Sequence, residues 1–129
     1  MSPFILDGVS YNVRIPENGI KRSGQVTDGS NAGRNISGAM IRDIIGTFYN
    51  YTISIEADDT DLEEYDNLFE TLSAPVSDHT LTVPYGQETL TFQAYITDVS
   101  DTLEHIDEHG NHWGSLTLNF IAMKPQRRP

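Results

Sequence analysis

The residues best suited to chemistry in this chain lie near its C-terminus, in the string His105-Ile106-Asp107-Glu108-His109. Two histidines around a glutamate, in the order H-x-x-E-H, form the zinc-binding motif of one group of hydrolases. The motif works on a helix, where the two imidazoles lie one turn apart and hold a single ion. Here the string leads into Gly110-Asn111, and strand-like segments flank it. We therefore expect the tip of a hairpin over residues 107–111, which does not suit a zinc hydrolase.

The same hairpin prediction argues against a metal site. In an extended strand, His105 and His109 share a face but lie about 13 Å apart, which is too far to ligate one ion. His112 joins them only if the loop folds back. We therefore expect no bound metal, and the candidate ligands, if an ion binds, are His105, His109 and His112.

Other strings that suggest a site lack the residues that would complete it. Asp58-Asp59-Thr60-Asp61 has neither the glycine nor the glutamate of an EF-hand calcium loop at the required spacing. The glycine-rich stretch 29–38 is not followed by the Gly-Lys-Ser/Thr of a phosphate-binding loop. The sequence has no Gly-x-Ser-x-Gly string and no cysteine. We therefore expect a protein that is not an enzyme, with no catalytic residue and no cofactor.

Charge is divided between the ends and the middle of the chain. The net charge is −11, and all eight basic residues lie in the segments 14–42 and 124–128. Between Asp43 and Met123 the chain holds sixteen of its nineteen acidic residues and no lysine or arginine. Such an acidic body repels phosphates, so we expect no specific binding of DNA or RNA. Basic ends and an acidic body suit contacts between copies of the chain, as in a ring or a stack.

Hydrophobic periodicity predicts the elements that position these residues. Apolar and polar residues alternate over 51–57, 90–97 and 116–120, which is the pattern of strands with one buried face. We expect Tyr49-Asn50 to bend the chain before the first of these strands.

One helix is predicted over residues 61–73. It begins at Thr60-Asp61-Leu62-Glu63, which has the Thr-x-x-Glu form of a capping box, and it ends before Pro75. Its apolar face consists of Leu62, Tyr65, Leu68, Phe69 and Leu72. A helix this short needs a packing partner. We therefore predict one mainly β domain over residues 1–129, a β-sandwich or barrel of about eight strands with one packed α-helix and a short basic tail at 124–129.

Composition supports a globular domain. The chain has 129 residues, 37% of them hydrophobic and 21% charged, which is one domain's length and too apolar for a disordered protein. No stretch approaches the roughly 20 apolar residues of a membrane span, and residues 1–7 lack the basic region of a secretory signal. We therefore expect synthesis in a cytoplasm and no contact with a membrane.

Aromatic residues on the predicted strands indicate a protein–protein contact surface. Several tyrosines alternate with polar groups, and tyrosine is enriched where proteins meet. Two arginines are the expected partners for the acidic groups of a neighbouring copy. The expected contact residues are Arg34, Arg42, Tyr49, Tyr51, Tyr85 and Tyr95.

The order of several segments resembles small structural proteins encoded in the tail regions of phages and prophages of Gram-positive bacteria. These segments are Leu6–Val13, Lys21–Ser23, Asp28–Arg34, Arg42–Tyr51, Leu72–Pro75, Val83–Gly86 and Trp113–Pro125. The resemblance implies a fold similar to tail-tube and distal-tail proteins and assembly into a ring of six. It also implies a non-enzymatic part of the virion, made in the host cytoplasm, whose partners are its own copies and other tail proteins. DNA would pass through the acidic lumen of that ring.

Two further functions stay open on the sequence. A monomeric virion adaptor or carbohydrate-binding module would use Trp113 and Tyr85 to stack on a sugar. A zinc hydrolase would use His105, Glu108 and His109. Glycan binding would identify the first, and about one zinc ion per chain would identify the second.

Overall fold

A computed structural model describes residues 4–28, 33–34, 40–41 and 44–128. Its elements, in chain order, are β1 (Ile5–Leu6), β2 (Ile20–Asp28), β3 (Gly33–Arg34), β4 (Met40–Ile41), β5 (Ile44–Ile55), α1 (Leu62–Leu72), β6 (His79–Tyr85), β7 (Glu88–Tyr95), β8 (Thr102–Asp107), β9 (Gly110–Gly114) and β10 (Leu116–Ala122). The mainly β fold with one helix is confirmed, and the helix predicted over 61–73 is found at 62–72. None of the helices in the described ranges is long and apolar enough to cross a membrane.

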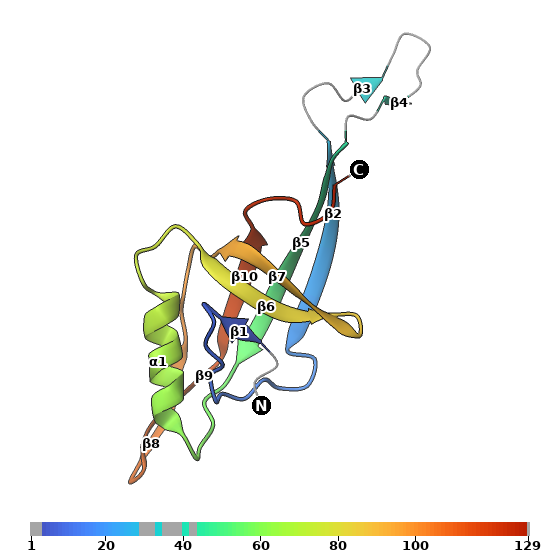
Figure 1. Cartoon of the computed structure of the whole chain (residues 1–129). Helices are drawn as coiled ribbons and strands as arrows, with labels where there is room; N and C mark the ends of the chain where they lie inside the picture. Colours follow the sequence, from blue (N-terminus) through green and yellow to red (C-terminus); the bar gives the residue numbers. More distant parts are fainter. Residues whose placement is uncertain (1–3, 29–32, 35–39, 42–43, 129) are drawn as a thin grey trace.

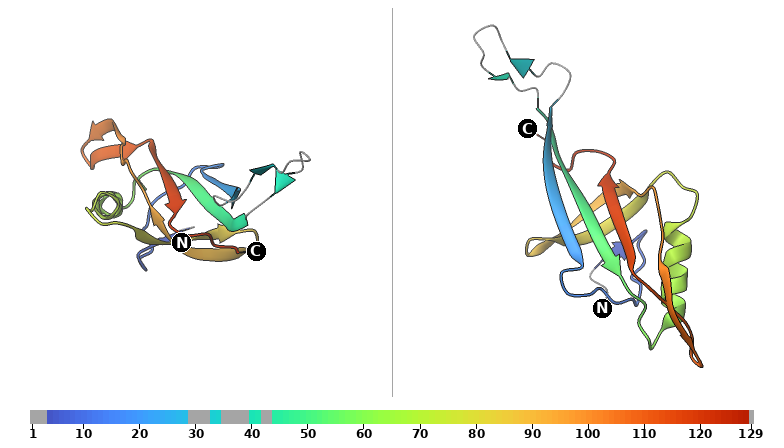
Figure 2. Two further views of the ribbon diagram at one scale, coloured as in Figure 1. Left: turned by 90° about the horizontal axis from the view of Figure 1, so that it is seen from above. Right: turned by 180° about the vertical axis from the view of Figure 1, so that it is seen from behind.

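Six strands form one antiparallel sheet in the order β1-β6-β7-β10-β5-β2. β7 and β10 pair through only two residue pairs, at Ile121 and Ala122. At this junction the sheet folds over, so that β6 and β7 cross the layer formed by β10, β5 and β2 (Figures 1 and 2). The result is a sandwich-like fold, with α1 packed beside the layers.

The core lies between these two layers. The predicted alternation is confirmed in β5, where Tyr51, Ile53 and Ile55 are buried and the residues between them are half-buried. It is also confirmed in β10, where every second residue from Leu116 to Ala122 is buried. The helix adds Tyr65, Leu68 and Leu72 to the same core.

The helix begins differently from the sequence prediction. Its N-cap is Asp61, which makes no side-chain capping hydrogen bond, so the capping box predicted at Thr60 is wrong. Thr60 instead donates from its backbone N–H and its hydroxyl to Asp58 Oδ1. The acidic first turn is confirmed, because Glu63 and Glu64 lie next to the positive end of the helix dipole.

β2 and β5 form a long hairpin that projects beyond the core (Figure 1). They pair from Ile20 opposite Ile53 to Asp28 opposite Ile44. The bend expected at Tyr49-Asn50 is wrong, because β5 runs unbroken through both residues. Most of the glycine-rich stretch between the two strands lies outside the described residues, and so does the predicted contact residue Arg42.

Residues 124–128 run beside the projecting half of β5. Beyond the end of β10, the tail takes the place of that strand beside β5. Thr47 of β5 donates its backbone N–H to Arg127 O, and the Gln126 N–H donates to Thr47 O. The Gln126 side chain continues this ladder, since its Oε1 accepts from the Tyr49 N–H and its Nε2 donates to Tyr49 O. A Cβ at Gly46 would lie 2.5 Å from Arg127 O, so the close approach of the tail requires glycine there.

Candidate functional site

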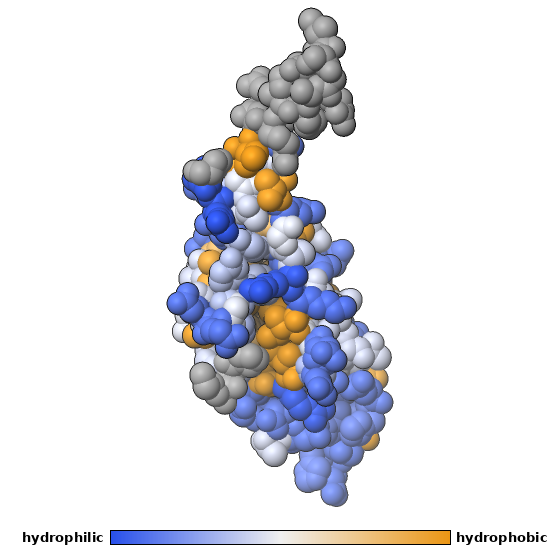
Figure 3. All heavy atoms as spheres, turned by 90° about the vertical axis from the view of Figure 1, so that its right-hand side faces the viewer, coloured by the Kyte–Doolittle hydropathy of each residue, from blue (hydrophilic) through white to orange (hydrophobic). Residues whose placement is uncertain are grey.

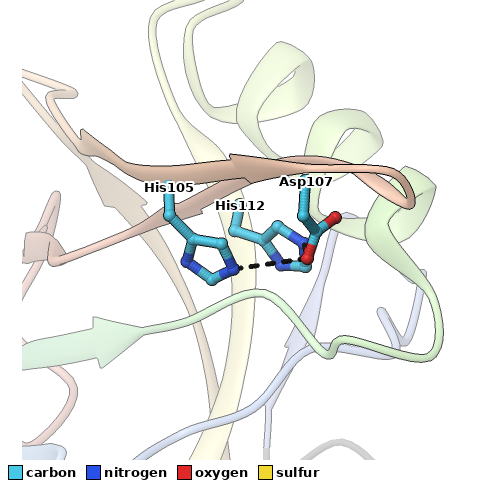
Figure 4. A group of neighbouring side chains, drawn as sticks. All are labelled: His105, Asp107 and His112. Carbon is cyan, nitrogen blue, oxygen red and sulfur yellow. Dashed lines mark ion pairs between the residues drawn. The ribbon is translucent and has the colours of Figure 1, made fainter.

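The β8–β9 hairpin brings together histidines that are seven positions apart in sequence. A two-residue turn at Glu108-His109 sets the register, and this register places His105 opposite His112. Asp107 lies two residues from His105 and therefore on the same face of β8. Figure 4 shows the three side chains grouped below the hairpin. We call His105, Asp107 and His112 the histidine–aspartate cluster.

The nitrogen and oxygen atoms of this cluster lie close to one another. His112 Nε2 is 2.9 Å from Asp107 Oδ2, and His105 Nε2 is 3.5 Å from the same oxygen. The two imidazole rings stack with their centroids 4.0 Å apart and their planes at 11°. One nitrogen or oxygen atom from each of the three residues fits within 4.8 Å of the other two.

The two histidines differ in burial and in their partners. His112 is 6% exposed, whereas 60% of the His105 side chain is exposed. His112 Nδ1 lies 3.1 Å from Asp59 Oδ1 and makes a hydrogen bond with it. Its Nε2 is fully buried and lies 2.9 Å from Asp107 Oδ2, with which it forms an ion pair when His112 is protonated.

Charge in the cluster shifts two pKa values. The contact with His112 lowers the pKa of Asp107 to about 2. The same contact raises the pKa of His112, although burial acts in the opposite direction. The two shifts have the same meaning, because the contact favours the charged forms of both groups, a carboxylate at Asp107 and an imidazolium at His112.

The sequence prediction for this segment is confirmed in its main feature, because the predicted hairpin is present at residues 102–114. Glu108 and His109 form its turn, so the string does not have the helical arrangement of the H-x-x-E-H motif. His109 is exposed in the turn, and its backbone N–H donates to Asp107 Oδ1. Sequence reasoning missed Asp59 and Asp107. The two-residue turn was the signal that would have placed His112 opposite His105.

A second candidate region lies where β6 meets the long hairpin. The Tyr49 and Tyr85 rings meet edge to face with centroids 5.1 Å apart, and their hydroxyl oxygens are 3.1 Å apart. The Arg22 guanidinium lies 5.2 Å from the centre of the Tyr85 ring. The hydrogen bond between the tyrosines lowers the pKa of Tyr49 and raises that of Tyr85. We call Arg22, Tyr49 and Tyr85 the aromatic–basic cluster.

The predicted contact residues have different surroundings in the structure. Tyr49 and Tyr85 are half-buried partners, and Tyr95 is half-buried on β7. Tyr51 is only 1% exposed and donates its hydroxyl to Pro84 O, so it is a core residue and not part of the surface. The Arg34 side chain, like all of Arg42, lies outside the described residues.

The acidic residues of α1 and β8 and the basic residues of β2 and the C-terminal tail lie on opposite sides of the molecule. The acidic residues of α1 and β8 lie on the left in Figure 1, whereas Lys21 and Arg22 of β2 and the basic tail lie on the right. Arg14 is an exception, since it pairs with Glu56 at 2.5 Å.

Hydrophobic side chains are exposed on the projecting part of the hairpin, below the grey segment in Figure 3. The exposed ones there are Val26, Ile44 and Ile45.

A groove beside α1 contains Trp113. Its volume is about 380 Å³. Its lining residues are Tyr65, Asp66, Phe69, Glu70, Asp101 and Trp113. Tyr85 is not among them, so the two aromatic residues proposed for sugar stacking belong to different surfaces.

Comparison with known proteins assigns no family to this chain. No protein-family model matches it. No curated protein matches it either. The class that the observations define is a mainly β protein with one helix, a projecting hairpin and a charge-divided surface, and its function is argued from these features.

Proposed function

We propose that this protein is a non-enzymatic structural subunit of a phage tail, of the tube or distal-tail type, which joins copies of itself into a ring. The observation that carries the proposal is the β2–β5 hairpin. It projects from the core, and six of the nine residues of β2, residues 21–26, are exposed. The resemblance of several sequence segments to tail proteins agrees with a subunit that acts through its shape.

β2 is suited to bind a neighbouring subunit. It is an edge strand of the six-stranded sheet, and within the described residues only β5 pairs with it. An edge strand can offer to another chain the backbone groups that face away from its one partner strand. Lys21 and Arg22 on this edge disfavour pairing of β2 with a second β2, because like charges would meet. The exposed edge of β2 is therefore better suited to contact another surface of the neighbouring copy than to pair with that copy's β2.

The charge distribution supports the same head-to-tail arrangement. One side of the molecule carries the basic hairpin, and the other carries the acidic residues of α1 and β8. In a head-to-tail arrangement the basic side of one copy would face the acidic side of the next, and the two charges attract. Contacts between two different surfaces close into a ring when the rotation between subunits fits, and we expect six copies. The acidic residues also suit a lumen through which DNA passes without adhering.

The oligomeric state tests this proposal. We expect rings with a central hole by electron microscopy of the purified full chain, and a mass of several subunits by light scattering in low salt. Val26→Asp places a negative charge among the exposed apolar residues of the basic hairpin and should dissociate the rings. Val26→Ile is the matched control, because it keeps this exposed position apolar.

Two outcomes would overturn the proposal. One is a monomer at high protein concentration in low salt. The other is a ring that survives Val26→Asp as it survives Val26→Ile, which would show that the hairpin is not the contact. Circular dichroism of both variants separates loss of assembly from loss of fold.

Carbohydrate binding by a monomeric adaptor is the second candidate, and the Trp113 groove supports it. An aromatic ring beside three carboxylates suits the faces and hydroxyls of a sugar. We expect a glycan array to show binding that Trp113→Ala abolishes and that Tyr85→Ala leaves unchanged. An array without binding would remove this candidate.

A further inference from the structure

We propose that His105, Asp107 and His112 form a site for a divalent transition-metal ion of the zinc class, with Asp59 as a positioning residue. This inference is independent of the tail function. It departs from the sequence prediction, because the ligand set includes His112 and Asp107 and leaves out His109. The ion would be structural, linking β8 to β9 and to the loop that precedes α1.

The distances in the cluster fit the coordination sphere of one ion. With metal–ligand bonds of about 2.1 Å, two ligands lie about 3.4 Å apart around a tetrahedral ion and about 3.0 Å apart at adjacent octahedral positions. Asp107 Oδ2 lies 2.9 Å from His112 Nε2 and 3.5 Å from His105 Nε2. Asp107 is therefore near enough to share an ion with either imidazole.

His112 has the surroundings of a metal-bound histidine. Its Nδ1 bonds to the Asp59 carboxylate, and this bond favours the proton on Nδ1 and the lone pair on Nε2. A carboxylate behind the histidine is the usual outer partner of a metal ligand. Nε2 is buried and its near neighbour is a carboxylate oxygen, Asp107 Oδ2 at 2.9 Å, so in a neutral His112 the Nε2 lone pair faces the cluster with no donor to satisfy it. A bound cation would satisfy it.

His105 supplies the movement that binding needs. Nitrogen lone pairs lie in the ring plane, and two planes at 11° cannot direct both lone pairs at one ion. His105 is on an exposed strand, and 60% of its side chain is exposed. It is free to turn out of the stack toward Asp107, and water would complete the coordination.

The ligand types select the class of ion. Two imidazoles and one carboxylate suit Zn²⁺, Co²⁺, Ni²⁺ or Cu²⁺, whereas Mg²⁺ and Ca²⁺ prefer oxygen ligands alone. His109 is not among the residues that come together, although it is the nearest other histidine in sequence. This contrast provides a control within the same hairpin.

The test is metal titration of the full chain, purified without a histidine tag and treated with a chelator. We expect calorimetry with zinc chloride to show one site per chain, and Co²⁺ to give a visible absorption band. His112→Gln, Asp107→Asn and His105→Gln should each weaken binding at least tenfold, whereas His109→Gln should leave it unchanged. His105 is exposed, so His105→Gln tests the site without a risk to the core.

Asp59 needs its own readout, because it acts through His112. We expect Asp59→Asn to weaken binding about 10- to 100-fold while the Co²⁺ band keeps its position, since the ligands are the same. The site proposal is overturned by absence of binding, by loss of binding in His109→Gln equal to that in His105→Gln, or by binding that survives His112→Gln. A shifted Co²⁺ band in Asp59→Asn would overturn the positioning role.

Discussion

Tyr65 shows how one buried side chain ties the helix to the rest of the molecule. It is 2% exposed in the core, and its hydroxyl donates to Asp101 Oδ2 at 2.7 Å. Burial is the main cause that raises its pKa, and the hydrogen bond to Asp101 adds to it. The phenol therefore stays protonated in the folded protein at a pH where it ionises in the unfolded chain.

The sign of the resulting pH dependence follows from this difference. Below the unfolded pKa of about 10, both states hold the proton and the stability is unaffected. Above it, the unfolded chain loses the proton first, so the free energy of unfolding falls as the pH rises. One such group contributes a slope of at most about 1.4 kcal/mol per pH unit.

We therefore predict that Tyr65→Phe makes the protein less sensitive to alkali. Urea denaturation at a series of pH values above 9 should give a steep loss of stability in the natural chain and a shallower one in the variant. Tyr95→Phe is the control, because Tyr95 is half-buried at the end of another strand. Parallel slopes for the natural chain and Tyr65→Phe would contradict the prediction.

The histidine–aspartate cluster shows how far sequence reasoning reaches at this scale. The hairpin was predicted with its tip at residues 107–111, but the two-residue turn that places His105 opposite His112 was not predicted. Asp59 was not predictable, because it reaches His112 from a loop 53 residues earlier in the chain. Burial of His112 depends on that same long-range packing.

At the scale of elements, the C-terminal segment completes the sheet where β10 has ended. Gln126 acts as a strand residue through its side chain, which forms two hydrogen bonds with the backbone of Tyr49. The pairing of β10 with β5 ends at Phe120 opposite Tyr51, so the preceding part of β5 depends on the tail. The tail therefore supports the base of the projecting hairpin.

We predict that Gln126→Ala lowers the free energy of unfolding by about 1–2 kcal/mol, because it removes two part-buried hydrogen bonds. Hydrogen exchange at the Tyr49 amide should become faster, and exchange in β6 should not. Arg128→Ala is the control, since that residue is exposed. Unchanged exchange at Tyr49 would show that water replaces the amide at no cost.

The elements themselves were largely predictable, because their signals are local. Alternation over 51–57 and 116–120 gave strands, and apolar spacing over 62–72 gave the helix. The bend expected at Tyr49-Asn50 failed because these residues are held straight from two sides, by β2 and by Gln126. Gln126 lies 77 residues after Tyr49 in the sequence, so the residues around Tyr49 give no indication of this contact.

At the scale of the whole molecule, the fold converts a division of charge along the sequence into a division in space. The two basic segments are far apart in the chain, but the bridge between Thr47 and Arg127 places the tail on the same hairpin as β2. The acidic residues of α1 and β8, from the middle of the chain, lie on the side of the molecule away from β2 (Figure 1). Sequence alone did not show this, because strand pairing between distant segments decides it.

This arrangement makes association sensitive to salt. Screening shortens the reach of exposed charges from about 10 Å at 0.1 M salt to about 3 Å at 1 M. If basic hairpins meet acidic sides, salt should shift the assembly toward smaller species, and light scattering across a sodium chloride series would show it.

Lys21→Glu should reproduce the effect of salt at low ionic strength, because it reverses an exposed charge on β2. Lys21→Arg is the matched control, because it keeps the positive charge at the same position and should leave the salt dependence unchanged. Assembly that strengthens with salt would instead mean that the exposed apolar residues of the hairpin dominate the contact and that charge opposes it.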